Sequence, residues 1–481
     1  MAHELKNKFA YQALSSVTQV LLPLIAYPYI TRVLGPGYLG KINYVDFVAQ
    51  MFMIFAAFGI PFYGVREIAR VQNNGTQRAA LIRELTVLLI VFSTIALLFF
   101  AVVAYKAGSG NSTLYWLGAA NILLSTFSYD WYVQGMEAFR FTAIRSLLVR
   151  LAMLLAFFVF VKAGTDYTIY YGIFTAGYLA ITIINISKLL SENSFVKSPL
   201  QYRRHLKPLW HFFLTSSAIS IYIYFDTILL RQLTHSDAAV GYYTLSLKMV
   251  KICQVALLTA GMVLLPRLSF LAGANNRDEI KVYLSKLLSL LLAAGLPLCT
   301  ILYLLAPEII EVISGKAFIP AVPVMRILAF LPLVIGLSNL FSFQVLVPFK
   351  QEKKFLVAVI AGCITSIGLN LWLIPIFAER GSAYANIITE ILITLITGSY
   401  ALKIIRFGGS LSTMLQTVFC CLLFIPVVAA VRVIAAHPLP VLCVAAAACL
   451  IVYYSVQYAI FKNSFIRELQ QYISALAGFK K

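Results

Sequence analysis

Lys248 and Lys251 lie in the middle of an apolar stretch, residues 241–265, and theirs are the side chains of this sequence best placed to do chemistry. A charged group inside a membrane-spanning helix is costly unless it faces a cavity or a partner. Two residues three positions apart share one face of a helix. The pair therefore predicts an interior helix face that handles something anionic.

Two arginines extend this pattern. Arg32 and Arg231 lie near the ends of two other apolar stretches. A guanidinium adds a planar fork that suits anionic oxygens. Near a helix end, however, either arginine could simply extend to the membrane surface. The arginines thus have two interpretations, as part of an anion site or as interfacial residues.

Three acids also occur inside apolar stretches, namely Asp46, Asp226 and Glu390. Asp46 shares one helical stripe with Asn43 and Gln50. Stripes of polar residues at helical spacing are expected to face a shared interior rather than lipid. The acids either balance the charge of the cations or bind a coupling proton or sodium ion, and both roles stay open.

The composition indicates that membrane-spanning helices position these residues. Of the 481 residues, 61% are hydrophobic and 12% are charged, and the mean hydropathy is +0.87. Soluble domains contain about 25% charged residues. The net charge of +20 is spread through short loops, which does not suggest a nucleic-acid partner. The chain is predicted to be an all-α polytopic membrane protein.

Hydropathy predicts about fourteen transmembrane helices. They are placed near residues 11–31, 41–63, 82–104, 113–133, 143–162, 168–190, 211–233, 241–265, 283–305, 326–347, 356–377, 384–405, 415–435 and 440–461. Lys and Arg favour alternate loops by roughly three to one. This bias predicts that both termini are cytoplasmic.

A weak internal repeat divides the chain. Arg32 and Arg231 each precede a short glycine-containing loop and a second apolar stretch. A repeat of this kind is typical of two-lobed transporters. The predicted parts are an N-lobe of helices 1–6 (1–190), a cytoplasmic amphipathic linker (191–210), a C-lobe of helices 7–12 (211–405), and helices 13–14 with a cytoplasmic tail (406–481).

Motifs for catalysis or metal binding are absent from the sequence. The five histidines are scattered, and there is no G-x-S-x-G motif or glycine loop for a phosphate. The seven cysteines have no metal-ligand spacing and are expected to be small buried hydrophobes. The sequence predicts that the protein is not an enzyme, and no catalytic or metal-binding residue is assigned.

Four segments resemble one known family. They are YPYITRVLGPGYLGK at 27–41, DWYVQGMEAFR at 130–140, DTILL at 226–230 and ISGKAF at 313–318. Together they are similar to the polysaccharide repeat-unit flippases, the Wzx-type members of the MOP superfamily. The resemblance implies a V-shaped pair of six-helix lobes, to which the fourteen predicted spans add two C-terminal helices. It also implies transport of undecaprenyl-diphosphate-linked oligosaccharides across the bacterial inner membrane, in the synthesis of lipopolysaccharide O-antigen or exopolysaccharide.

The resemblance also implies roles for the residues singled out above. The diphosphate is expected to bind four cations: Arg32, Arg231, Lys248 and Lys251. Three residues at the cytoplasmic mouth are expected to hold a helix end or a gate: Asp130, Glu137 and Arg140. Alternating access would carry the sugar across, with no cofactor other than a coupling H+ or Na+.

The expected partners are the lipid-linked oligosaccharide and membrane lipids. The polymerase and chain-length proteins of the same pathway are further candidates. Three alternatives stay open: a drug or cation exporter of the MOP superfamily, a peptidoglycan-precursor flippase, and a membrane-embedded polysaccharide polymerase or glycosyltransferase. The exporter would favour an acidic or aromatic cavity, whereas the cations favour an anionic cargo.

Overall fold

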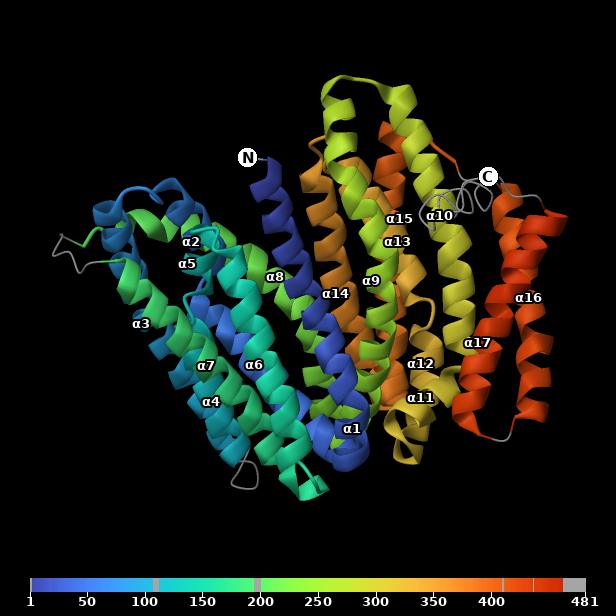
Figure 1. Ribbon diagram of the computed structural model, residues 1–481, viewed down its shortest axis with the longest axis horizontal. Helices are drawn as coiled ribbons and strands as arrows, with labels where there is room; N and C mark the ends of the chain where they lie inside the picture. Colours follow the sequence, from blue (N-terminus) through green and yellow to red (C-terminus); the bar gives the residue numbers. More distant parts are fainter. Residues whose placement is uncertain (1, 107–111, 194–199, 409–410, 436, 462–481) are drawn as a thin grey trace. The chain divides into compact units, whose positions relative to one another are not determined.

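A computed structural model of the protein describes residues 2–106, 112–193, 200–408, 411–435 and 437–461. No strand occurs in these ranges, and almost all of their residues are helical (Figure 1). The all-α prediction is therefore confirmed.

The helices fall into two compact units, Met1–Gly241 and Tyr242–Lys481. The first unit contains α1 (Ala2–Ala57), α2 (Ile60–Arg70), α3 (Gly75–Lys106), α4 (Ser112–Thr126), α5 (Asp130–Gly135), α6 (Phe139–Phe160), the short η2 (Gly164–Asp166), α7 (Tyr167–Glu192) and α8 (Arg203–Thr234). Helix α8 packs on α1 within this unit. The lobe boundaries drawn from the sequence stay predictions.

The second unit begins inside α9 (Asp237–Gly273). It continues with α10 (Arg277–Leu304), α11 (Ala306–Ser314), η3 (Lys316–Ala321), α12 (Val322–Leu328), α13 (Leu331–Phe341), the π-turn η4 (Ser342–Leu346), α14 (Glu352–Phe377), α15 (Glu379–Ile404), α16 (Leu411–Ile434), α17 (Pro438–Ser455) and η5 (Val456–Ile460).

Every predicted span coincides with one or more of these helices. Within the described part of the chain, nine helices are long and apolar enough to cross a membrane, or ten if a bent pair forms one span. The protein is thus a multi-pass membrane protein, but the exact number of fourteen spans is not confirmed. The basic segment at 462–481 and part of the linker, 194–199, lie outside the described residues.

Two breaks shape the first hairpin of unit 1. Gly35 has a φ of 71° and interrupts α1, where a side chain would strain the backbone. Phe58 and Gly59 then adopt positive φ values of 43° and 77°, and Pro61 follows at the start of α2. The axis bends by 42° at this second break. The span predicted at 41–63 is therefore divided between two helices, and Pro61 lies at the beginning of the second.

The core of unit 1 contains two clusters of apolar side chains. One joins α1 to α3, α4, α6 and α7 through residues such as Val45, Phe100 and Tyr171. The other lies where α2, α3, α5 and α8 meet, and includes Tyr132 and Leu209. These clusters hold the polar residues described below in fixed positions on their helices.

The core of unit 2 is formed mainly by α10, α13 and α15, with buried residues such as Leu291 and Leu340. Helices α16 and α17 pack against each other and against α10 and α11, around Phe424 and Cys449 (Figure 1). All seven cysteines are free, but Cys443 is exposed, so the expectation of buried cysteines holds for only part of the set.

Candidate functional site

The predicted cations are divided between the two units. Arg32 and Arg231 belong to unit 1, where Arg32 is exposed on α1 and Arg231 is partly buried near the end of α8. Lys248 and Lys251 are exposed on α9 in unit 2, one helical turn apart. Their assembly into one diphosphate site stays a prediction.

Arg231 has a carboxylate partner that the sequence analysis did not assign. Its Nε donates a hydrogen bond to Oδ1 of Asp237, the first residue of α9. The guanidinium also lies over the ring of Tyr44, with Cζ 6.0 Å from the ring centroid. The arginine is therefore held at the end of α8 rather than only extended to a surface.

Asp46 occupies a polar centre in unit 1. Its Oδ2 accepts a hydrogen bond of 2.5 Å from Nε2 of Gln50, as the stripe on α1 predicts. Its Oδ1 accepts a bond of 3.2 Å from the hydroxyl of Tyr171 on α7. Asn121 of α4 is fully buried beside Tyr171. The sequence predicted the α1 stripe but not the residues that other helices add.

The two other acids are buried. Asp226 is 4% exposed on α8 in unit 1, and Glu390 is 8% exposed on α15 in unit 2. One turn before Glu390, Nδ2 of Asn386 donates to the hydroxyl of Tyr243 at 3.2 Å. Burial of this kind fits both roles left open for the acids, since a buried carboxylate needs either a partner or a bound cation.

The residues predicted to form a gate differ in their surroundings. Oδ1 of Asp130 accepts hydrogen bonds from Nη1 of Arg145 at 2.8 Å and from Nδ2 of Asn185 at 3.0 Å. Arg145 is buried and also donates to Asn185. Glu137 and Arg140 are exposed. Asp130 thus joins the start of α5 to α6 and α7, which fits its predicted role in holding a helix end.

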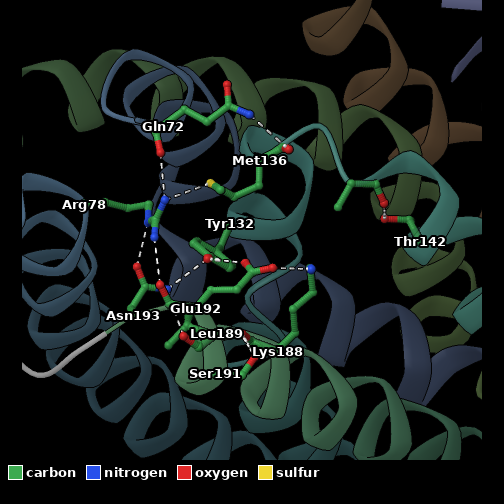
Figure 2. A network of polar contacts seen from close by, with 11 residues as sticks. Gln72, Arg78, Tyr132, Met136, Thr142, Lys188, Leu189, Ser191, Glu192 and Asn193 are labelled. Atoms are coloured by element: carbon green, nitrogen blue, oxygen red, sulfur yellow. Dashed lines mark hydrogen bonds and ion pairs between the residues drawn. The ribbon is translucent and has the colours of Figure 1, made fainter. Parts of the chain in front are cut away.

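A second polar network lies close to this point in unit 1 and is shown in Figure 2. Arg78 donates to Oδ1 of Asn193 at 2.7 Å and to the backbone oxygen of Glu192 at 2.8 Å. The hydroxyl of Tyr132 donates to Oε2 of Glu192 at 2.6 Å, and Lys188 forms an ion pair with the same side chain. The network therefore joins α3, α5 and the end of α7.

A third network joins the start of α8 to α2 and α3. Nε2 of His205 lies 2.6 Å from Oε2 of Glu84, and Nδ1 lies 2.5 Å from the hydroxyl of Tyr63. Because an ionised carboxylate only accepts hydrogen bonds, Nε2 carries the proton and Nδ1 accepts from Tyr63. Arg204 donates to the same carboxylate at 2.8 Å. None of these residues was singled out from the sequence.

The sequence contains little indication that these residues would form networks. An acid such as Glu84 near the start of an apolar stretch resembles any interfacial charge. Arg145 occurs in a segment with several other basic residues, and only its burial separates it from them. No cluster of three or more His, Cys, Asp or Glu that could hold a metal occurs in the part of the chain that the structure describes.

Comparison with known proteins identifies the family. The sequence profile described as "Polysaccharide biosynthesis protein" matches residues 5–272. Two relatives carry the name "Putative O-antigen transporter". That of Escherichia coli (strain K12) is 26% identical over 395 residues, which are 81% of this chain and 95% of the relative. That of Shigella dysenteriae is 24% identical over 384 residues, 78% and 94% of the two chains.

Solved structures of low sequence identity share the fold. The lipid II flippase MurJ, in an inward closed conformation, has a TM-score of 0.72 at 14% identity and covers 94% of this chain and 99% of its own. An inward-facing multidrug resistance MATE family transporter of the MOP superfamily has a TM-score of 0.63 at 13% identity, covering 80% and 94%. The fold is that of the MOP superfamily, and because the profile matches more than half of the sequence, the chain belongs to the polysaccharide biosynthesis protein family.

Proposed function

We propose that the protein is a flippase that moves undecaprenyl-diphosphate-linked oligosaccharide repeat units across the bacterial inner membrane by alternating access. The proposal is supported by the family, by relatives named as O-antigen transporters and by the fold shared with a lipid II flippase. In this proposal the protein is a transporter and not an enzyme. Both termini are cytoplasmic, as the loop charges favour.

The observation that carries the proposal is the pair of lysines on α9. Lys248 and Lys251 are exposed, lie one turn apart and interrupt a long apolar helix of unit 2. An ammonium group inside a membrane-spanning segment is stabilised where it contacts an anion. Their proposed ligand is the diphosphate, for which Arg32 and Arg231 are the other two proposed cations. The lipid tail stays in the bilayer.

The acids supply energy coupling or charge balance in this proposal. Asp46, Asp226 and Glu390 either exchange a proton or sodium ion during transport or neutralise the cations. For Asp46, the carboxylate accepts hydrogen bonds from Gln50 and Tyr171, which hold it in place on α1. Replacing Asp46 by asparagine distinguishes these roles. If Asp46 is a coupling residue, transport by the variant should no longer depend on the ion gradient. If Asp46 only balances charge, that dependence should remain.

Residues near α5 form the cytoplasmic gate in this proposal. Asp130 would change partners from Arg145 when the gate moves, while Glu137 and Arg140 face the surface. Proteins that consume or lengthen the sugar, a polymerase and a chain-length regulator, are proposed as partners at the outer side of the membrane.

The test is a flipping assay in cells that lack their own flippase. The Lys248→Ala/Lys251→Ala double variant is compared with wild type at matched abundance. Lys281→Ala/Lys353→Ala is the control, because it removes the same charge from exposed positions of unit 2. Loss of flipping in the first variant alone supports the diphosphate site. Unchanged flipping would refute that site, and no flipping by wild type would favour an exporter of other cargo.

A further inference from the structure

A polar pocket of about 230 Å3 lies within unit 1. Helix α1 contributes Lys41 and Tyr44 to its lining, and the end of α8 contributes Arg231. His235, in the connection between α8 and α9, and Asp237, the first residue of α9, also line the pocket. The pocket is smaller than the ~300–1,000 Å3 clefts that hold drug-sized ligands, so it suits one small group rather than a whole oligosaccharide.

The charges of the lining favour an anion. Lys41 and Arg231 carry two positive charges, against the single carboxylate of Asp237. The bond from Arg231 to Asp237 uses Nε. A guanidinium has two further amino groups, which can bind an anionic oxygen pair. An anion entering the pocket would therefore compete with Asp237 for Arg231 and would add Lys41 as a second cation.

Aromatic rings flank the cation on α1. Nζ of Lys41 lies 5.0 Å from the ring centroid of Tyr167. Tyr167 stacks on Tyr38 with centroids 4.8 Å apart, and 38% of Tyr38 is exposed. An aromatic pair with one exposed ring, in contact with a cation that lines the pocket, resembles sites that hold the apolar face of a ligand and its charged group together.

Close backbone packing holds the pocket in shape. A Cβ on Gly40, the neighbour of Lys41, would fall 1.7 Å from the backbone oxygen of Asp237. A Cβ on Gly241 would fall 2.2 Å from the backbone oxygen of Pro36. Glycine at both positions lets α1 and the start of α9 touch, and this contact fixes Lys41 next to Asp237 and Arg231.

We propose that this pocket binds an anionic group of the transported saccharide, either a phosphoryl group or a sugar carboxylate, at the end of unit 1 that faces outward in the predicted orientation. The assignment of a saccharide as the source of the anion rests on the proposed function. The pocket is lined by residues of unit 1. It shares Arg231 with the proposed diphosphate site, but it adds Lys41 and does not include the lysine pair on α9.

The test measures anion binding by the purified full-length protein in detergent, without transport. Sodium pyrophosphate and sodium glucuronate are titrated separately at constant ionic strength, and binding is followed by calorimetry. The variants are Lys41→Gln and His235→Asn, the latter because asparagine tolerates the left-handed backbone of His235, whose φ is 53°. Lys162→Gln is the control, since Lys162 is exposed at the same end of unit 1 but outside the pocket.

The expected result is binding of at least one of the two anions by wild type and by Lys162→Gln, with about tenfold weaker binding by Lys41→Gln. Preference for pyrophosphate assigns a phosphoryl ligand, and preference for glucuronate assigns a sugar acid. Equal affinities of wild type, Lys41→Gln and His235→Asn, or no binding by wild type, would overturn the proposal. The flipping assay of the wild type separates this proposal from the proposed function. If the protein binds an anion through Lys41 but does not flip lipid-linked sugars, the pocket is confirmed as an anion site and the proposed function is refuted.

Discussion

Replacement of Glu84 by alanine is expected to destabilise unit 1 by about 3 kcal/mol. The carboxylate is 3% exposed and accepts from Nε2 of His205 at 2.6 Å, from the backbone N of Gln201 at 3.0 Å and from Arg204 at 2.8 Å. Arg204 is 54% exposed and can be hydrated again, so its loss contributes little. His205 is buried, so its Nε2 donor left unsatisfied costs up to about 3 kcal/mol, whereas Gln201 is exposed and its backbone N–H can be hydrated.

The prediction can be checked by denaturant titration of the protein in mixed micelles, followed by tryptophan fluorescence. Glu84→Gln keeps an acceptor for His205 and should lose about 1 kcal/mol. Glu67→Ala is the control, because its ion pairs with exposed arginines are worth about 0–1 kcal/mol. A double-mutant cycle with His205→Ala should show coupling of at least about 0.5 kcal/mol. Equal stability of Glu84→Ala and Glu67→Ala would refute the reasoning.

Three further substitutions have expected outcomes that the same titration measures. Arg145→Ala should destabilise the protein by about 1–3 kcal/mol, because it leaves the buried Oδ1 of Asn185 without its donor, whereas Asp130, 41% exposed, can be hydrated; a loss below about 0.5 kcal/mol would contradict this reasoning. Gly40→Ala should lower stability strongly, whereas Gly37→Ala, whose Cβ meets nothing within 4 Å, should be close to neutral; similar effects would show that the close approach at Gly40 is unimportant. Arg432→Ala should cost about 1 kcal/mol, because its two bonds to Glu308, at 2.7 and 2.9 Å, are partly solvated; a larger loss would mean that the pair holds α16 to α11.

The spans could be predicted from the sequence because hydropathy is a local property of the chain. Each predicted stretch coincides with helical residues in the structure. The bends were predicted less well. The span predicted at 41–63 runs across the break at Phe58 and Gly59, where the helix axis changes direction, and Pro61 begins the next helix. A proline in sequence marks a helix boundary without saying on which side the helix lies.

The polar stripe at Asp46 illustrates how far the site could be predicted. Helical spacing correctly placed Gln50 beside Asp46, since residues four apart are neighbours on a helix. Tyr171, which bonds the same carboxylate, is 125 positions away and belongs to a different helix. No pattern in the sequence connects these two residues, because their contact depends on how α7 packs against α1.

The sequence by itself determined the class of the protein, the positions of its helices and the charges they carry into the membrane. These follow from composition and periodicity, which act over a few residues at a time. Only the tertiary structure decided which polar groups meet. Glu84 and His205 are separated by 121 residues, and Arg432 and Glu308 by 124. Such pairs are decided by helix packing, since a polar group inside a bundle must find its partner wherever the apolar surfaces bring the helices together.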